Sequence, residues 1–337
     1  MSPRKPSVTA QDVARLAGVS RAVVSRALSS NGSISPDARA RVLRAAEELG
    51  YQVNFLAQGL NRPRSHLIGV IVSRISDPFR SALLDALLNE IQRQGFQALV
   101  SEIHSEQDLA HTLRRFTQFR VSVVIVTSGQ PPEALVNECV QQHIPVVGIN
   151  RQPTIPGVDY VCSDNVAGAE LAADQLLRSG CRRFGWLNHS PSTWAGRMRG
   201  EAFSRALQAR GVDVERNLAI LACPEEGYTG GFQAAALADE ALEGIFCANA
   251  QIACGFLDGM RQRGKQAPED YQLIGFDNTP PTAQYSYQLT TLHQDVAAIS
   301  RQTLARLQER TVDPLQPSRT TWVEVTLIHR RTSPFII

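Results

Sequence analysis

Apolar residues near the start of the chain recur every three or four positions, which is the spacing of one buried helix face. This pattern predicts three short helices, over residues 9–17, 21–28 and 36–49. Gly18 and Gly50 follow the first and third helices, where glycine commonly ends a helix. A small all-α unit is therefore predicted. Its expected inward residues are Val13, Leu16, Ala17, Val24, Ala27, Leu28, Ala38, Val42, Ala45 and Leu49.

Beyond residue 66, short apolar runs alternate with amphipathic segments of helical length. Such alternation predicts an α/β fold in which parallel sheets are covered by helices on both faces. Because about 270 residues exceed one hydrophobic core, two α/β lobes are expected. The predicted strands are 67–73, 96–101, 121–126, 146–149, 160–162, 184–187, 218–221, 244–246, 272–276 and 321–327, with helices at 81–94, 167–179, 199–210, 232–239 and 251–263.

The composition narrows the class of protein. With 43% hydrophobic and 20% charged residues in 337, the chain is globular rather than disordered or fibrous. No apolar run is long enough to span a bilayer, and the basic N-terminus lacks the apolar segment of an export signal. The six cysteines show no CxxC spacing, which indicates reduced thiols rather than a zinc site. We therefore expect a cytoplasmic protein without metal or cofactor.

Charge divides the chain unevenly. Residues 1–66 hold ten basic and four acidic side chains, a net +6, so the remainder carries −4 of the total +2. A basic unit on a mildly acidic body suggests that only the first unit binds a polyanion. A solvated basic face would produce the same balance, so charge alone does not decide.

A helix, a glycine-containing turn and a second helix form the helix-turn-helix arrangement of DNA-binding proteins. The second predicted helix leaves Arg21, Ala22, Ser25 and Arg26 on its outer side. Arginine can donate two hydrogen bonds to a guanine edge in the major groove, while serine and backbone amides hold phosphates. A plain three-helix bundle with a solvated surface is the alternative.

The residues themselves resemble a known family. Residues 8–20 and 24–28 are similar to the start of LacI-family transcription regulators, and so are residues 42–51 with Asn54 and Ala57. The resemblance implies a sequence-specific DNA-binding transcriptional regulator, a repressor whose operator affinity is controlled by a carbohydrate-like effector, a sugar or a sugar acid. A purine or another non-sugar metabolite is the alternative effector.

The resemblance also implies where DNA binds. In the family, paired hinge helices enter the minor groove and a leucine opens a base step, as expected of apolar wedges. Gln58 replaces a common arginine in this segment, and Gly59 lies inside the expected hinge helix. The implied DNA-binding residues are Thr9, Ser20, Arg21, Ala22, Ser25, Arg26, Asn54, Ala57 and Leu60.

Family likeness implies a domain plan as well: a helix-turn-helix domain over residues 1–52, a hinge helix and linker over 53–65, and a body over 66–337. The body resembles the periplasmic-binding-protein type I fold. Its expected lobes are residues 66–163 with 293–316, and 164–292 with 317–331. Since one recognition helix reads only a few base pairs, a homodimer on pseudo-palindromic operator DNA is expected.

In such a body, ligands bind in the cleft between the lobes. Carboxylates and amides would bind sugar hydroxyls, arginine would bind adjacent oxygens, and an aromatic ring would cover the apolar sugar face. The implied effector-binding residues are Asp77, Phe79, Asp164, Arg197, Arg199, Tyr228, Asn249 and Asp277.

Each of these residues also has a purely structural interpretation. Arg199 and Asp277 could form an internal ion pair, Tyr228 could belong to the core, and Asp77 could cap the next helix. Ala250 replaces an acid that commonly follows Asn249 in the family. The motifs of P-loop, dinucleotide-binding, HExxH and GxSxG proteins are missing from the sequence. An enzyme or a solute-binding protein fused to a DNA-binding unit is therefore only a remote alternative.

Overall fold

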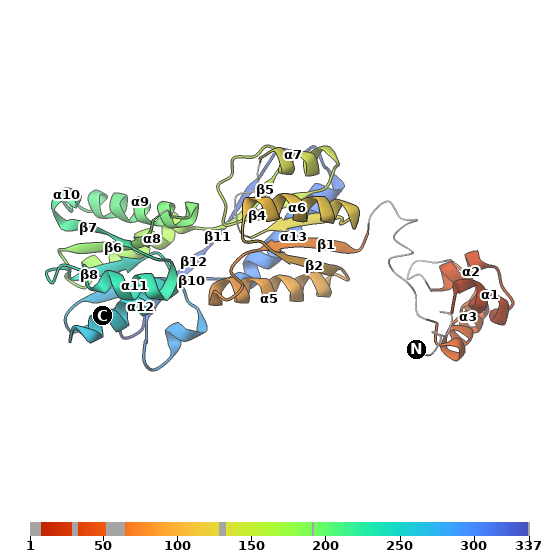
Figure 1. The fold of residues 1–337 in the computed structure, drawn as a ribbon, viewed down its shortest axis with the longest axis horizontal. Helices are drawn as coiled ribbons and strands as arrows, with labels where there is room; N and C mark the ends of the chain where they lie inside the picture. Colours follow the sequence, from red (N-terminus) through yellow and green to blue (C-terminus); the bar gives the residue numbers. More distant parts are fainter. Residues whose placement is uncertain (1–7, 29–32, 52–64, 128–132, 191, 336–337) are drawn as a thin grey trace. The chain divides into compact units, whose positions relative to one another are not determined.

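The structure, a computed structural model, describes residues 8–28, 33–51, 65–127, 133–190 and 192–335 (Figure 1). The chain divides into two compact units, Met1–Ser65, called the head, and His66–Ile337, called the body. The hinge residues expected to bind DNA, Asn54, Ala57 and Leu60, lie outside the described residues, as does Gly59.

The head contains helices α1 (Ala10–Ala17), α2 (Arg21–Ala27) and α3 (Pro36–Leu49), as the apolar spacing predicts. Thr9 caps α1 by accepting a hydrogen bond from the Asp12 backbone N–H, and Asp12 returns the contact to the Thr9 backbone. Helix α2 begins after Ser20 and α3 after Ser35, each of which caps its helix with the side-chain oxygen. Gly18 and Gly50 end α1 and α3 in the left-handed conformation.

The helices pack around a small core that differs from the expected one at Leu16. This side chain is 47% exposed, although it was expected to face inward. The buried face of α1 runs through Val13, Ala14 and Ala17, and Leu16 lies about a third of a turn from its centre. The buried core residues are Val13, Ala14, Ala17, Val24, Ala27, Val42, Ala45 and Ala46.

The body contains two six-stranded sheets, in the orders β11-β5-β4-β3-β1-β2 and β12-β10-β9-β8-β6-β7. Every strand pair is parallel except β10 with β12. The first lobe has β1 (Leu67–Val72), β2 (Gln97–Glu102), β3 (Val123–Val126), β4 (Val146–Ile149), β5 (Asp159–Ser163), β11 (Thr320–Val323), α5 (Pro78–Arg93), α6 (Glu106–Gln118), α7 (Glu133–Gln141) and α13 (Val296–Val312).

The second lobe is built in the same way. It has β6 (Phe184–His189), β7 (Leu218–Cys223), β8 (Gly244–Cys247), β9 (Gln272–Asp277), β10 (Thr290–Gln294), β12 (Val325–Ile328), α8 (Asn165–Arg178), α9 (Trp194–Ala209), α10 (Val214–Asn217), α11 (Gly227–Ala235), α12 (Ala250–Gln262) and a short 3-10 helix, η1 (Pro280–Ala283). The predicted α/β class with two parallel sheets is confirmed.

Helices cover both faces of each sheet, which explains why the inner strands β1, β3, β4 and β8 contain only apolar residues and glycine. In the first lobe, α5 and α13 pack on one face, and α6 and α7 on the other (Figure 1). In the second lobe, α8 and α9 pair on one face, and α11 and α12 on the other. One large cluster containing Phe203, Phe246 and Phe276 forms the second core.

The chain passes between the lobes three times, and the third crossing differs from expectation. The predicted strand 321–327 is two strands, because β11 pairs with β5 in the first sheet and β12 pairs with β10 in the second. The segment 317–323, expected in the second lobe, therefore ends in the first sheet, and the chain crosses at Glu324. The charged Glu324 interrupts the segment at the crossing, but a single acidic residue does not by itself indicate a change of sheet. Strand β10 lies in a stretch that the sequence pattern does not predict as a strand.

All six cysteines are free and buried. Within the described ranges, no helix is both long and apolar enough to cross a membrane. The same residues contain no cluster of His, Cys, Asp or Glu able to hold a metal ion.

Candidate functional site

The outer face of α2 is the candidate DNA-binding surface. Arg21, Ala22, Ser25 and Arg26 are all exposed, whereas Val24 faces the core of the head. The Arg26 Nε donates to the Ala22 carbonyl at 3.3 Å, four residues earlier on the same helix, and the side chain is exposed. An exposed helix face with one arginine in its first turn and another in its last turn suits the major groove of DNA.

Thr9 and Ser20 stand at helix N-termini, where backbone amides favour phosphate binding. The Thr9 hydroxyl donates to Asp12 Oδ2 at 2.7 Å, and Ser20 Oγ accepts from the Val23 backbone N–H at 3.4 Å. Both side chains are exposed, so capping and a phosphate contact can be combined at these two positions. The head thus presents every described candidate DNA contact on its surface.

We expect Arg26→Ala to weaken binding to operator DNA by about 1–3 kcal/mol and to relax the preference at one base pair. Arg44→Ala is a matched control, since Arg44 is also exposed and its Nε donates to the carbonyl of Ala40, four residues earlier. Fluorescence anisotropy on operator and on random DNA measures both variants. Equal losses of Arg26→Ala on the two DNAs would show a phosphate contact instead.

Two adjoining cavities, of about 570 and 280 Å³, are lined by both lobes of the body. Their walls come from residues just after the carboxyl ends of parallel strands, where open α/β sheets bind ligands. Six of the eight effector-binding residues expected from the sequence line these cavities: Asp77, Phe79, Arg197, Arg199, Asn249 and Asp277.

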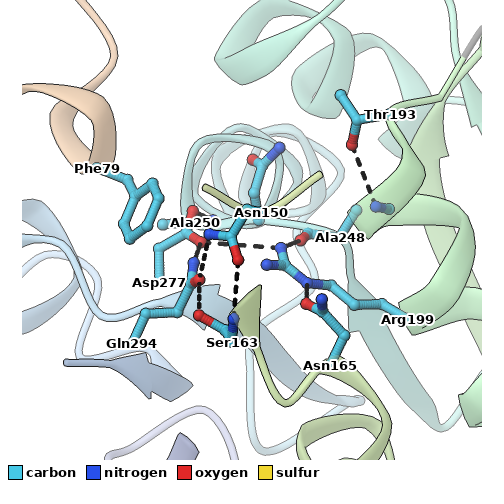
Figure 2. A network of polar contacts seen from close by, with 12 residues as sticks. Phe79, Asn150, Ser163, Asn165, Thr193, Arg199, Ala248, Ala250, Asp277 and Gln294 are labelled. Atoms are coloured by element: carbon cyan, nitrogen blue, oxygen red, sulfur yellow. Dashed lines mark hydrogen bonds and ion pairs between the residues drawn. The ribbon is translucent and has the colours of Figure 1, made fainter. Parts of the chain in front are cut away.

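Arg199 is the most deeply buried charged group of the cavity wall. Its Nε donates to Asn165 Oδ1 at 2.7 Å, and its Nη1 donates to the Ala248 carbonyl at 2.6 Å (Figure 2). The guanidinium carbon lies 3.5 Å from the centroid of the Phe276 ring, and Asp277 Oδ1 lies 3.8 Å from Nη1. Burial lowers the pKa of Arg199 to about 10, so the side chain stays charged at neutral pH.

Asp277 faces Arg199 at the end of β9. Its Oδ1 accepts a hydrogen bond from Gln294 Nε2 at 2.6 Å, and its Oδ2 accepts from the Ala250 backbone N–H at 3.4 Å. Burial raises the pKa of Asp277 to about 6, and the positive charge of Arg199 offsets part of this effect. The internal ion pair considered from the sequence is present, and it forms part of the cavity wall.

Gln294 connects this pair to the first lobe. Its Oε1 accepts hydrogen bonds from Ser163 Oγ at 2.5 Å and from Asn150 Nδ2 at 3.2 Å. Asn150 Oδ1 in turn accepts from the Ser163 backbone N–H at 2.8 Å (Figure 2). Hydrogen bonds therefore connect Asn150 at the end of β4 to Asp277, and the ion pair between Asp277 and Arg199 extends this connection to α9.

The protonation of Asp277 makes stability depend on pH. An aspartate in the unfolded chain titrates near 3.8, so between about pH 4 and 6 the folded state binds more protons than the unfolded state. We expect the unfolding free energy of the wild type to fall, relative to Asp277→Asn, by up to about 3 kcal/mol as pH rises through this window, and then to level off. Urea unfolding followed by tryptophan fluorescence measures it; a constant difference would contradict the buried proton.

Asp77 and Asn249 each combine a helix cap with a place in the cavity wall. Asp77 Oδ1 accepts from the backbone N–H groups of Phe79 and Arg80, both at 3.0 Å. Asn249 Oδ1 accepts from the Ile252 backbone N–H at 2.9 Å. The capping interpretation of Asp77 therefore holds, and the remaining oxygen lone pairs stay available to a ligand.

The structure places Tyr228 and Asp164 outside both cavities. The Tyr228 hydroxyl donates to Asp258 Oδ2 at 2.8 Å, and its ring stacks on Phe232, so the side chain lies on the outer surface of α11 and α12. Asp164 caps α8 by accepting from the Ala167 backbone N–H at 2.9 Å. The aromatic residues of the larger cavity are instead Phe79 and Trp194.

The cavity also contains polar residues that the sequence analysis did not single out. Asn150 and Arg151 directly follow the predicted strand 146–149, so the rule that ligands lie beyond strand carboxyl ends pointed to them. Gln294 is the last residue of β10, a strand that the sequence pattern does not predict, so no feature of the sequence indicated that Gln294 lines the cavity. The residues missed in the larger cavity include Arg80, Asn150, Arg151, Trp194 and Gln294.

Comparison with known families matches both units. Residues 9–54 match the model for bacterial regulatory proteins of the lacI family. Residues 173–333 match the model for a periplasmic binding protein-like domain. The two matches correspond to the helix-turn-helix head and to most of the second lobe with its crossings.

Individual relatives extend the likeness over nearly the whole chain. The HTH-type transcriptional regulator GalS of Salmonella typhimurium is 32% identical over 87% of each chain. A LacI family transcriptional regulator from Enterococcus faecium with bound ribose matches 80% of this chain and all of its own, with 26% identity and a TM-score of 0.72. The lac repressor dimer bound to operator and the anti-inducer ONPF matches 98% of this chain and all of its own, with 23% identity and a TM-score of 0.86, which shows a shared fold.

Proposed function

This chain belongs to the lacI family of bacterial regulatory proteins, and from that premise we propose that it represses transcription under the control of a carbohydrate-like effector bound between the lobes of its body. As a member of that family it is a DNA-binding transcriptional regulator and not an enzyme. We further propose that it acts in the cytoplasm on pseudo-palindromic operator DNA.

The observation that carries the proposal is the hydrogen-bonded chain from Asn150 through Gln294 and Asp277 towards Arg199. A ligand that enters the cavity meets charged and amide groups of both lobes, and these groups are already bonded to one another. Binding that favours one relative position of the lobes changes the fraction of DNA-competent protein, which is the thermodynamic content of allostery.

A sugar suits the chemistry of the wall. Asp77, Asn249 and Asn150 offer oxygens and amides to hydroxyl groups, while Phe79 and Trp194 offer aromatic faces to the apolar side of a pyranose or furanose ring. The ribose-bound relative from Enterococcus faecium supports the same class of ligand. A purine would use the same aromatic and amide groups, so purines are the alternative class of effector that the ligand screen must distinguish from sugars.

The effector is tested by differential scanning fluorimetry with neutral sugars, sugar acids, sugar phosphates and nucleobases. Binding to the folded body raises its Tm by mass action, by an amount that increases with concentration above Kd. A compound that raises the Tm should then change the anisotropy of labelled operator DNA in complex with the protein. Tm shifts from nucleobases alone would replace the sugar with a purine, and a binder that leaves operator affinity unchanged would refute the regulatory role.

We expect a homodimer in solution. One α2 helix reads only a few base pairs, and specific binding in a genome requires two half-sites. Light scattering of the DNA-free protein at micromolar concentration should give about twice the 36.9 kDa of the chain. A monomer that keeps full operator affinity would contradict this assembly.

A further inference from the structure

The larger cavity carries more positive than negative charge. It is lined by five arginines, at positions 74, 80, 151, 197 and 199, and by two carboxylates, Asp77 and Asp277. Arg199 pairs with Asp277, and Arg74 pairs with Glu226 of the smaller cavity. The lining of the larger cavity therefore holds more arginines than carboxylates, and one of the two carboxylates, Asp77, serves as the cap of α5.

Arg151 is the least satisfied of these arginines. Its Nε is buried and has no hydrogen-bond partner within the part of the chain that the structure describes. Burial lowers its pKa to about 10, and the charge of Arg80 acts in the same direction. A guanidinium whose Nε has lost water without gaining an acceptor, and which is repelled by a nearby cation, is unfavourable in the ligand-free cavity.

Arg80 is held in place at the same edge of the first sheet. Its Nη1 donates to the Ser73 carbonyl at 3.0 Å and to Ser73 Oγ at 2.6 Å, just beyond the end of β1. Burial also lowers the pKa of Arg80. Because β1 and β4 are parallel and flank β3, their carboxyl ends bring Arg80 and Arg151 to one side of the cavity.

We propose that Arg80 and Arg151 form an anion site, and that the effector carries a carboxylate or phosphate bound there. This inference rests on the proposed function of the cavity and adds the charge of its ligand. Guanidinium groups bind both kinds of oxyanion through paired, charge-assisted hydrogen bonds. Such an anion would bond to the terminal nitrogens of the two guanidinium groups and neutralise the repulsion between the two arginines. The volume of about 570 Å³ accommodates a monosaccharide acid or a monosaccharide phosphate.

The test compares wild type with Arg80→Gln and Arg151→Gln, using Arg178→Gln on the exposed side of α8 as the control. Inorganic phosphate, at ionic strength matched with sodium chloride, is the first probe. We expect phosphate to raise the Tm of the wild type and of Arg178→Gln more than chloride does, and to lose most of this effect in both cavity variants. The ligand-free Arg151→Gln protein should melt at or above the wild-type temperature, because an unpartnered buried cation has been removed.

Matched compounds then distinguish the source of the anion: glucose against gluconate and glucose 6-phosphate, and ribose against ribonate and ribose 5-phosphate. We expect an acid or a phosphate to bind where its neutral parent does not, with an affinity at least about tenfold lower in Arg151→Gln. An equal increase in Tm with phosphate in the wild type and in both cavity variants would overturn the anion site. A second result would overturn it as well: a neutral sugar that binds the wild type and all three variants equally and releases operator DNA. The second result would leave the proposed regulation intact, whereas anions that bind without affecting operator affinity would refute the regulation and keep the site.

Discussion

Replacing Arg199 by alanine is expected to abolish the response to the effector, while the ligand-free protein keeps its operator affinity within a few-fold. Arg199 lines both cavities and contacts Asn165, Ala248 and Asp277, so it is shared by the ligand site and by the hydrogen-bonded chain between the lobes. Without Arg199, the ligand no longer contacts a residue that also belongs to the connection between the lobes, so ligand binding no longer changes the position of the lobes. The head, which binds DNA, is a separate compact unit.

The measurement is operator anisotropy over a titration with an effector identified by its Tm shift. Loss of the guanidinium leaves Asp277 without its counter-charge, so its pKa should rise further and the Tm should fall. Arg199→Lys keeps the charge but not the paired donors, and it should fold better than alanine yet still respond poorly. Arg178→Ala, on the exposed side of α8, is the control. A wild-type response in Arg199→Ala would show that the effector binds elsewhere.

Replacing Arg310 by methionine is expected to destabilise the body by about 3–5 kcal/mol, the cost of breaking a buried ion pair from one side. Arg310 Nη2 lies 2.6 Å from Asp159 Oδ1, and Nε donates to Asp159 Oδ2 at 3.1 Å; the two side chains are only 2% and 1% exposed. Arg310 also donates to the carbonyls of Gln316 and Pro317. The pair therefore fixes the end of α13, and the segment that follows it, against β5.

Thermal unfolding should show this loss as a fall in Tm of about 10 °C. Arg301→Ala, an exposed position of the same helix, should change stability by less than about 0.5 kcal/mol. The double variant Arg310→Met with Asp159→Val removes both charges and should recover much of the loss, because no unpaired charge remains buried. If the double variant is no more stable than the single one, the hydrogen bonds of Arg310 to backbone carbonyls dominate its contribution.

Local sequence signals were sufficient to predict the three helices of the head. Thr9, Ser20 and Ser35 cap helices, and Gly18 and Gly50 end them, because these roles depend only on nearby backbone groups. Leu16 was misplaced, since helical spacing allowed it on either edge of the buried face and packing against α2 and α3 decided the outcome.

Most strands of the body could also be predicted from the sequence, because a strand covered by helices on both faces appears as a short run of apolar residues. The change from β11 to β12 could not be predicted in this way, since only Glu324 separates the two strands and only their pairing assigns them to different sheets. Tyr228 was likewise placed by resemblance near the ligand, whereas its hydrogen bond to Asp258 holds it on the outer surface.

The helix-turn-helix head and the α/β class of the body could be predicted from the amino-acid sequence, because helix caps and hydrophobic periodicity are properties of neighbouring residues. Six side chains of the cavity wall were expected only from the resemblance to the LacI family. Which distant residues meet depends on the tertiary structure. Asn150, Ser163, Gln294 and Asp277 are bonded to one another although up to 144 positions separate them in the chain. The charges near Arg80 and Arg151 likewise come from residues that are distant in the sequence. These residues meet because the carboxyl ends of parallel strands lie at one edge of the sheet.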